Sequence, residues 1–195
     1  MNSVPLQVVD GGKLPAQQRV LLQPAQPVQD KDGNVHHLPR FFYSVASWTD
    51  AHAVKLAEHF KLAELMMVDC READVLFREF PHYVPCAITL LAGFLEGFRR
   101  AVESPVFVSA NGGYRSPAHR RNLAKSTHCW GTAADIYRVG DNYLDNEKTI
   151  ARYAGIAESL GMQVYVRPHT HGDDHLHIDL GYVTVTPRDC SDRMA

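Results

Sequence analysis

Residues 167–183, RPHTHGDDHLHIDLGYV, hold four of the 11 histidines of this 195-residue chain together with three aspartates. As a β-strand, HLHIDL would project His175, His177 and Asp179 from one face and three aliphatic residues from the other. Two imidazoles on one strand face are suited to present nitrogen ligands to a zinc ion. The same alternation is typical of an edge strand with solvated histidines, so this stretch alone leaves both interpretations open.

A second polar stretch, STHCWGTAADI, covers Ser126 to Ile136. His128 and Asp135 lie seven positions apart, and this odd spacing would place them on opposite sides of an unbroken strand. They can converge only if the backbone bends between them, and Gly131 permits such a bend. Taken singly, a histidine and an aspartate near a glycine are ordinary loop residues.

Three motifs occur in an order that resembles the zinc D-Ala-D-Ala carboxypeptidase family. They are GYRSP at residues 113–117, SxHxxGxAxD at residues 126–135, and the HxH strand at residues 175–177. Relatives of that family include lysostaphin-type peptidases, phage L-alanyl-D-glutamate endolysins and the hedgehog signalling domain. The resemblance covers roughly residues 55–186 and does not extend to the first 40 or so.

The resemblance implies a zinc site formed by His128, Asp135 and His177. Two neutral imidazoles and one carboxylate leave Zn²⁺ with a single net positive charge and an open fourth position for water, as in catalytic zinc sites. Water bound in such a position loses a proton near neutral pH.

The resemblance also implies the remaining roles. Asp174, in the pattern DxxH, corresponds to the family's general base, although many bacterial carboxypeptidases carry Glu there and phage endolysins resemble this chain in carrying Asp. His175 corresponds to a group that hydrogen-bonds the developing oxyanion, and Arg115 to the arginine that binds a substrate carboxylate or carbonyl. Ser126 would line the substrate site. The plain alternatives are that His175 is an ordinary polar residue at an exposed strand position and that Arg115 is a solvated loop arginine.

Other polar residues near the motifs are given lesser roles. Cys129 is adjacent to His128, and adjacent residues rarely converge on one ion, so it is not expected to be a ligand. Asp179 shares the face of the ligand strand and is a candidate for supporting the histidines. The remaining histidines and acids near the motif are interpreted as a mobile rim: His169, His171 and Asp173.

The elements that must position these residues suggest an α+β fold, in which helices flank a small antiparallel sheet that carries the metal site. Helices are expected over residues 86–102 and 146–160, the second ended by Gly161. Strands are expected at VFVSA, MQVYV, HLHIDL and YVTVT, and LQVV and RVLL near the N-terminus could be strands as well. We expect residues 1–45 to form an extension packed on a peptidase-like domain of residues 46–195.

Composition excludes several classes of protein. A net charge of −2 and a single short basic cluster, RSPAHRR, argue against a nucleic-acid partner. No apolar run is long enough to span a membrane, and no export signal is visible, which favours a cytoplasmic protein or phage-type release to the cell wall. Four scattered cysteines without CxxC spacing are expected to be free thiols. The oligomeric state stays open.

The expected function is therefore a zinc metallopeptidase acting on peptidoglycan stem peptides that contain D-amino acids, as a carboxypeptidase or as an endopeptidase. A zinc-binding but non-catalytic hedgehog-like domain is the alternative, and the intact DxxH pattern argues against it. A helical interaction protein with incidental histidines is a third class, which the joint occurrence of three motifs disfavours.

Overall fold

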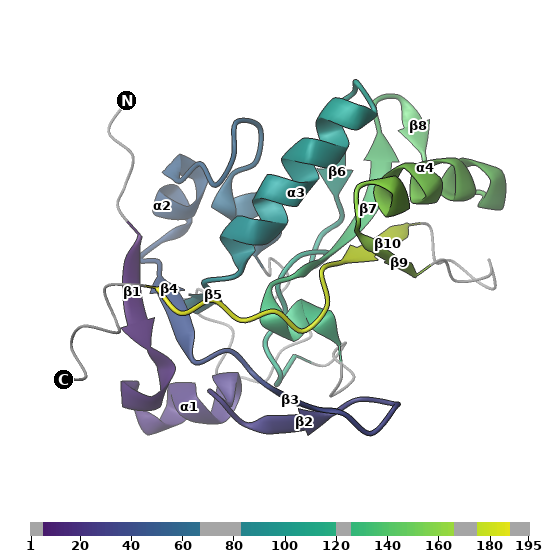
Figure 1. Cartoon of the computed structure of the whole chain (residues 1–195). Helices are drawn as coiled ribbons and strands as arrows, with labels where there is room; N and C mark the ends of the chain where they lie inside the picture. The colour runs from purple at the N-terminus through teal and green to yellow at the C-terminus, as the bar shows by residue number, and fades with distance from the viewer. Residues whose placement is uncertain (1–5, 67–82, 120–125, 166–174, 188–195) are drawn as a thin grey trace.

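The structure is a computed structural model that describes residues 6–66, 83–119, 126–165 and 175–187 (Figure 1). It is an α+β fold in which small antiparallel sheets are packed against helices. The helices are α1 (Ala16–Leu22), α2 (Trp48–Ala53), α3 (Ile88–Ala101) and α4 (Glu147–Ser159), with 3₁₀ turns η1 (Gly11–Lys13), η2 (Leu62–Leu65) and η5 (Thr127–Trp130). No helix in these four ranges is long and apolar enough to cross a membrane.

The main sheet has the strand order β6-β7-β10-β9, with β8 on the side of β7. Its strands are β6 (Val106–Val108), β7 (Ala133–Val139), β8 (Asn142–Tyr143), β9 (Gln163–Tyr165) and β10 (Leu176–Asp179). Every pairing is antiparallel. Leu176 and Ile178 of β10 are buried in the core, whereas His177 and Asp179 are half-buried on the other face. The alternation predicted for HLHIDL is therefore confirmed.

Helices α3 and α4 cover the apolar face of this sheet. Helix α3 buries Ile88, Leu91, Leu95 and Phe98, which recur at helical spacing and so form one apolar stripe. Helix α4 packs on β9 and β10 and contacts α3. Asn146 caps α4 by accepting a hydrogen bond from the backbone N–H of Thr149, so both predicted helices are present.

Strands near the N-terminus form a hairpin and, together with one strand from later in the chain, a second sheet. The second sheet has the order β1-β4-β5, from β1 (Gln7–Asp10), β4 (Phe41–Ser44) and β5 (Tyr83–Pro85). The hairpin pairs β2 (Pro27–Gln29) with β3 (Val35–His37) and lies beneath η5 in Figure 1. The indole N–H of Trp130 in η5 donates to the carbonyl of His37, 2.9 Å away. The hairpin therefore contacts the turn that carries His128.

Two of the predicted strands are wrong. RVLL forms the last part of helix α1, which buries Leu21 and Leu22 and ends at Gln23 in the left-handed conformation. YVTVT, residues 182–186, has no strand assignment. Leu180 instead donates a backbone hydrogen bond to the carbonyl of Thr132, and the hydroxyl of Thr132 donates to the carbonyl of Gly181. The chain leaving β10 is thus tied to the start of β7 rather than to a new strand.

Candidate metal centre

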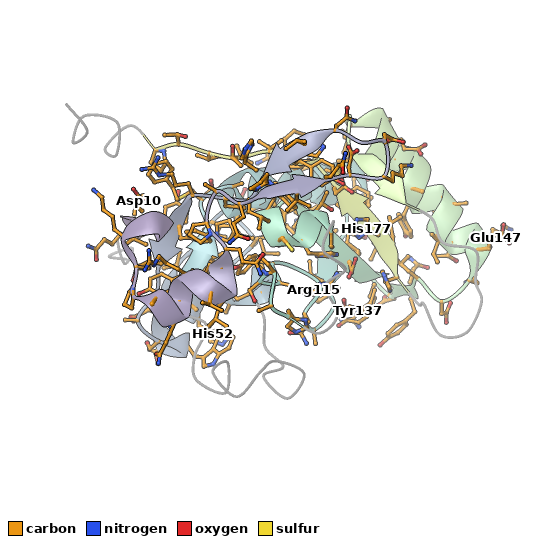
Figure 2. The ribbon with its side chains drawn as sticks, turned by 90° about the horizontal axis from the view of Figure 1, so that it is seen from below. Asp10, His52, Arg115, Tyr137, Glu147 and His177 are labelled. Atoms are coloured by element: carbon orange, nitrogen blue, oxygen red, sulfur yellow. The ribbon has the colours of Figure 1, made fainter. Side chains whose placement is uncertain are left out.

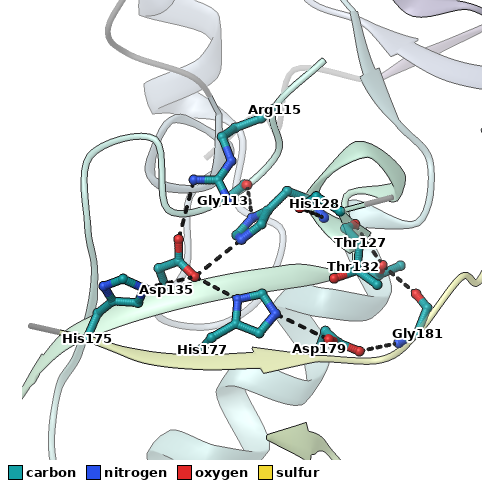
Figure 3. A network of polar contacts seen from close by, with 11 residues as sticks. Gly113, Arg115, Thr127, His128, Thr132, Asp135, His175, His177, Asp179 and Gly181 are labelled. Atoms are coloured by element: carbon teal, nitrogen blue, oxygen red, sulfur yellow. Dashed lines mark hydrogen bonds and ion pairs between the residues drawn. The ribbon is translucent and has the colours of Figure 1, made fainter. Parts of the chain in front are cut away.

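Strands β7 and β10 bring the first two predicted ligands together. Asp135 and His177 are cross-strand partners in the antiparallel pair, so their side chains project from the same face of the sheet. Nδ1 of His177 lies 2.8 Å from Oδ1 of Asp135 (Figure 3). The register of the sheet therefore brings together two of the three candidate ligands.

The turn before β7 supplies the third residue. Ser126 caps η5 by accepting a hydrogen bond from the backbone N–H of His128, and Gly131 ends η5 with a left-handed φ of 68°. This reversal places Nε2 of His128 3.2 Å from Oδ1 of Asp135. The ligand atoms of His128, Asp135 and His177 all lie within 4.8 Å of one another. The bend expected at Gly131 is present.

The imidazole of His128 is held in one tautomer. Its Nδ1 lies 2.7 Å from the carbonyl oxygen of Gly113, and because a carbonyl only accepts, Nδ1 carries the proton. Nε2 is left with its lone pair; it is buried and has no hydrogen-bond partner. A buried lone pair facing a carboxylate and a second imidazole is what a metal ligand requires.

The carbonyl of Gly113 reaches His128 because the backbone packs closely there. A Cβ at Gly113 would overlap the backbone of Leu65 in η2. The neighbouring N–H of Tyr114 donates to the carbonyl of Leu65, 2.8 Å away. Within the GYRSP motif the sequence drew attention only to Arg115, so the contact of Gly113 with the candidate ligand His128 was not predicted.

His177 is oriented from its other side by Asp179. Nε2 of His177 lies 3.2 Å from Oδ2 of Asp179, and Oδ1 of Asp179 accepts from the backbone N–H of Gly181 at 2.8 Å. The carboxylate accepts the proton on Nε2, which turns Nδ1 towards Asp135. Pairing a ligand histidine with a carboxylate is a common way to fix its orientation and raise its basicity.

The electrostatics of the three residues are coupled. Burial alone would raise the pKa of Asp135, but its close contacts with the imidazoles of His128 and His177 outweigh burial and hold that pKa well below its usual range. Burial would lower the pKa of His177, and its contacts with Asp135 and Asp179 instead raise it to about 9. Burial lowers the pKa of His128 despite the nearby Asp135. The ionised carboxylate of Asp135 thus lies between the two imidazoles.

Two further predicted residues lie at the same centre. Nη1 of Arg115 is 3.4 Å from Oδ2 of Asp135 and donates to the carbonyl of Asn111 at 3.2 Å. Its side chain is only 12% exposed, so it is not a solvated loop arginine. Nε2 of His175 is 3.7 Å from Oδ1 of Asp135. The two oxygens of Asp135 therefore face different groups, the guanidinium on one side and the imidazoles on the other.

The other predicted residues are placed as follows. Ser126 lies beside His128 as the cap of η5, and its hydroxyl is committed to that turn. Burial raises the pKa of Cys129 to about 12, and Cys129 does not belong to the group of residues whose ligand atoms converge with those of His128. Asp174, the predicted base, lies outside the described residues, as do His169, His171 and Asp173.

Comparison with known proteins agrees with this arrangement. The model of a family described as peptidase M15 matches residues 58–179, well over half of the chain and a range that includes all three candidate ligands. No curated protein and no solved structure matches the chain. M15 is a family of metallopeptidases, and the matched region begins beyond the hairpin β2–β3. The chain belongs to the peptidase M15 family.

Proposed function

We propose that this protein is a zinc-dependent peptidase that hydrolyses amide bonds next to D-amino acids in peptidoglycan stem peptides. The observation that carries the proposal is the convergence of His128, Asp135 and His177, whose ligand atoms lie within 4.8 Å of one another. Family membership supports metallopeptidase activity. Peptidoglycan and the preference for D-amino acids are inferred from the resemblance of the three motifs to D-Ala-D-Ala carboxypeptidases.

The donor set fits zinc. Nitrogen and carboxylate oxygen are ordinary zinc ligands, and three protein ligands leave a position for water or substrate. The buried Nε2 of His128, which has no hydrogen-bond partner, supports the same assignment. When bound to these residues, Zn²⁺ would polarise the scissile carbonyl and lower the pKa of water.

The proton transfers are assigned to Asp174. In this proposal its carboxylate takes a proton from the attacking water and delivers it to the leaving amine, the usual task of a general acid–base residue. His175 donates a hydrogen bond to the oxyanion that develops on the attacked carbonyl. Its imidazole is 27% exposed beside Asp135, which supports contact with a substrate.

Arg115 is assigned to hold the substrate. Its planar guanidinium suits bidentate binding of a carboxylate or carbonyl. Because one of its nitrogens contacts Asp135 and the carbonyl of Asn111, the side chain is already oriented before substrate arrives. Ser126 is proposed to line the same site at the start of η5.

The direct test is incubation of the zinc-loaded protein with defined muropeptides and mass spectrometry of the products. We expect loss of a terminal D-alanine from a carboxypeptidase, or internal cleavage from an endopeptidase. Peptides in which the D-residue is replaced by its L-isomer are the matched control and should remain intact. Full zinc occupancy without any cleavage would overturn the proposal and favour the non-catalytic, hedgehog-like alternative.

A further inference from the structure

A β-bulge re-aims a charged side chain of β7 towards the face that carries the metal centre. Phe107 of β6 pairs with Arg138 and Val108 pairs with Ile136, so Tyr137 is an extra residue in β7. Ile136 and Val139 both enter the core. Without the bulge, Arg138 would share the core face of Ile136. With it, Arg138 projects from the opposite face, which also carries Asp135.

Arg138 is held on aromatic rings. Its guanidinium carbon lies 3.9 Å from the centroid of the Phe107 ring, 5.5 Å from that of Tyr143 and 5.9 Å from that of Tyr137. Stacking of this kind orients a guanidinium and leaves the N–H groups at its edge free to bind.

The charge of Arg138 has no partner within the chain as described. None of the ion pairs of the described residues includes Arg138, and its buried Nε has no hydrogen-bond partner. A buried donor without an acceptor is costly, and a ligand at the site would satisfy it. The observation therefore points to an anion that binds along the edge of this guanidinium.

A cavity borders two of the rings that hold Arg138. It has a volume of about 170 Å³, lies between η2 and β6, and its lining includes Phe107, Tyr137 and Asn111. Glu64 also lines it, with its carboxylate accepting from the backbone N–H of Lys61. Asn111 is the residue whose carbonyl accepts from Arg115 at the metal centre. Arg115, Tyr137 and His177 are labelled in Figure 2. The cavity thus lies beside two of the rings that hold Arg138 and beside Asn111, the residue that orients Arg115, although neither arginine lines it.

We propose that Arg138 recognises a carboxylate on the peptide substrate, remote from the scissile bond. Arg138 lies three positions after Asp135 in β7, which corresponds to about 10 Å in an extended strand, or about three residues of an extended peptide. The substrate class is therefore an acidic peptide with a carboxylate about three residues from the amide that is cleaved. This assignment rests on the proposed peptidase function and deepens it.

The test separates recognition from catalysis by measuring binding to the metal-free, full-length protein, in which no turnover occurs. Two synthetic stem pentapeptides ending in D-Ala-D-Ala serve as probes, identical except that the second residue carries either a free carboxylate or its carboxamide. Isothermal titration calorimetry should give about tenfold tighter binding of the acid form by the wild type, the scale of a charge-assisted hydrogen bond.

Variants assign that preference to Arg138. Arg138→Gln should bind both peptides as weakly as the wild type binds the amide, and Arg138→Lys should keep part of the preference. Arg152→Gln on α4 is the matched control, because Arg152 also lies over a tyrosine ring, Tyr153, but on a helix that packs against the core face. Its preference should equal that of the wild type.

Equal binding of both peptides by the wild type, or no binding at all, would overturn the assignment of Arg138. An equal loss for both peptides in Arg138→Gln would overturn it too, because that result indicates a structural role. Thermal melts of each variant identify misfolding. The comparison of the acid and amide peptides on the wild-type protein does not depend on any variant. Failure of the zinc-loaded protein to cleave either peptide, with the preference intact, would contradict only the peptidase function.

Discussion

Asp135 and His177 are directly opposite each other in strands β7 and β10, and Oδ1 of Asp135 lies 2.8 Å from Nδ1 of His177. The same oxygen faces Nε2 of His128 at 3.2 Å. The antiparallel register and the reversal at Gly131 together create this convergence from residues 42 positions apart. The site therefore depends on the fold of the sheet and not on one local motif.

Replacing Asp179 should weaken metal binding without unfolding the protein. Its carboxylate accepts from Nε2 of His177, so Asp179→Asn loses a charged acceptor that orients the ligand. We expect zinc affinity to fall about 10- to 100-fold, the usual effect of removing such a partner. Competition with a chromophoric chelator measures this change. Asp141→Asn, at an exposed position after β7, is the control, and equal affinities of the two variants would disprove the role of Asp179.

Gly113 should not tolerate a side chain. A Cβ there would overlap the backbone of Leu65, so Gly113→Ala should lower the free energy of unfolding by about 2 kcal/mol or more. Gly155→Ala in α4 is the matched substitution, because its Cβ would meet no atom within 4 Å. That variant should be more stable than the wild type by about 1 kcal/mol, the difference in helix propensity. Denaturant melts compare the two, and similar stabilities would refute the close approach at Gly113.

The buried carboxylate of Glu96 in α3 should stabilise the protein in a pH-dependent way. It accepts from the backbone N–H of His59 at 2.9 Å and contacts Nδ1 of the same residue at 2.7 Å. Burial would raise the pKa of Glu96, but these contacts outweigh it and lower the pKa below its usual range. Because the folded-state pKa is depressed, the stabilisation is present above the unfolded value of about 4.5 and is lost as pH falls through the folded value.

We therefore expect Glu96→Gln to lose about 1–3 kcal/mol of unfolding free energy at pH 7, the cost of disrupting a buried charged hydrogen bond. The difference from the wild type should shrink as pH falls below 4. Glu58→Gln, at an exposed neighbouring position, should change little at either pH. Denaturant melts across this range provide the measurement, and a difference that does not vary with pH would contradict the assigned charge.

Asp174 and Asp173 form an internal control for the proposed general base. Asp174→Asn keeps size and polarity but removes basicity, so it should retain zinc and lose about 10²-fold or more in turnover. Asp173→Asn should stay near the wild type. Steady-state hydrolysis of a muropeptide measures both. Reversal of the two results would mean that the register assigned to the DxxH pattern is wrong.

The sequence predicted the parts of the site that follow from periodicity and local backbone chemistry. Alternation in HLHIDL identified the face that carries His177, and Gly131 marked the reversal before Asp135. Short apolar runs were less informative. RVLL is a helical segment because its leucines pack into the core as the end of α1. Four residues are too few to distinguish the spacing of apolar residues in a helix from that in a strand.

Contacts between distant residues could not be predicted from spacing. The carbonyl of Gly113 that fixes the tautomer of His128 is a backbone group with no sequence signature, 15 residues away. The hydrogen bond between Trp130 and His37 joins residues 93 positions apart. YVTVT has the alternation of a strand, but tethering of the preceding residues to Thr132 leads the chain away from the sheet. The proposed boundary at residue 45 remains a prediction.

The metal content of the purified protein is the direct test of the zinc site formed by His128, Asp135 and His177. Elemental analysis after zinc loading and dialysis should give about one Zn²⁺ per wild-type chain, because three ligands converge at one place. His177→Ala should hold almost none, whereas His175→Ala should remain near one. A wild-type protein that takes up no zinc would rule out this site, and equal losses in the two variants would show that the ligand on β10 is wrongly assigned.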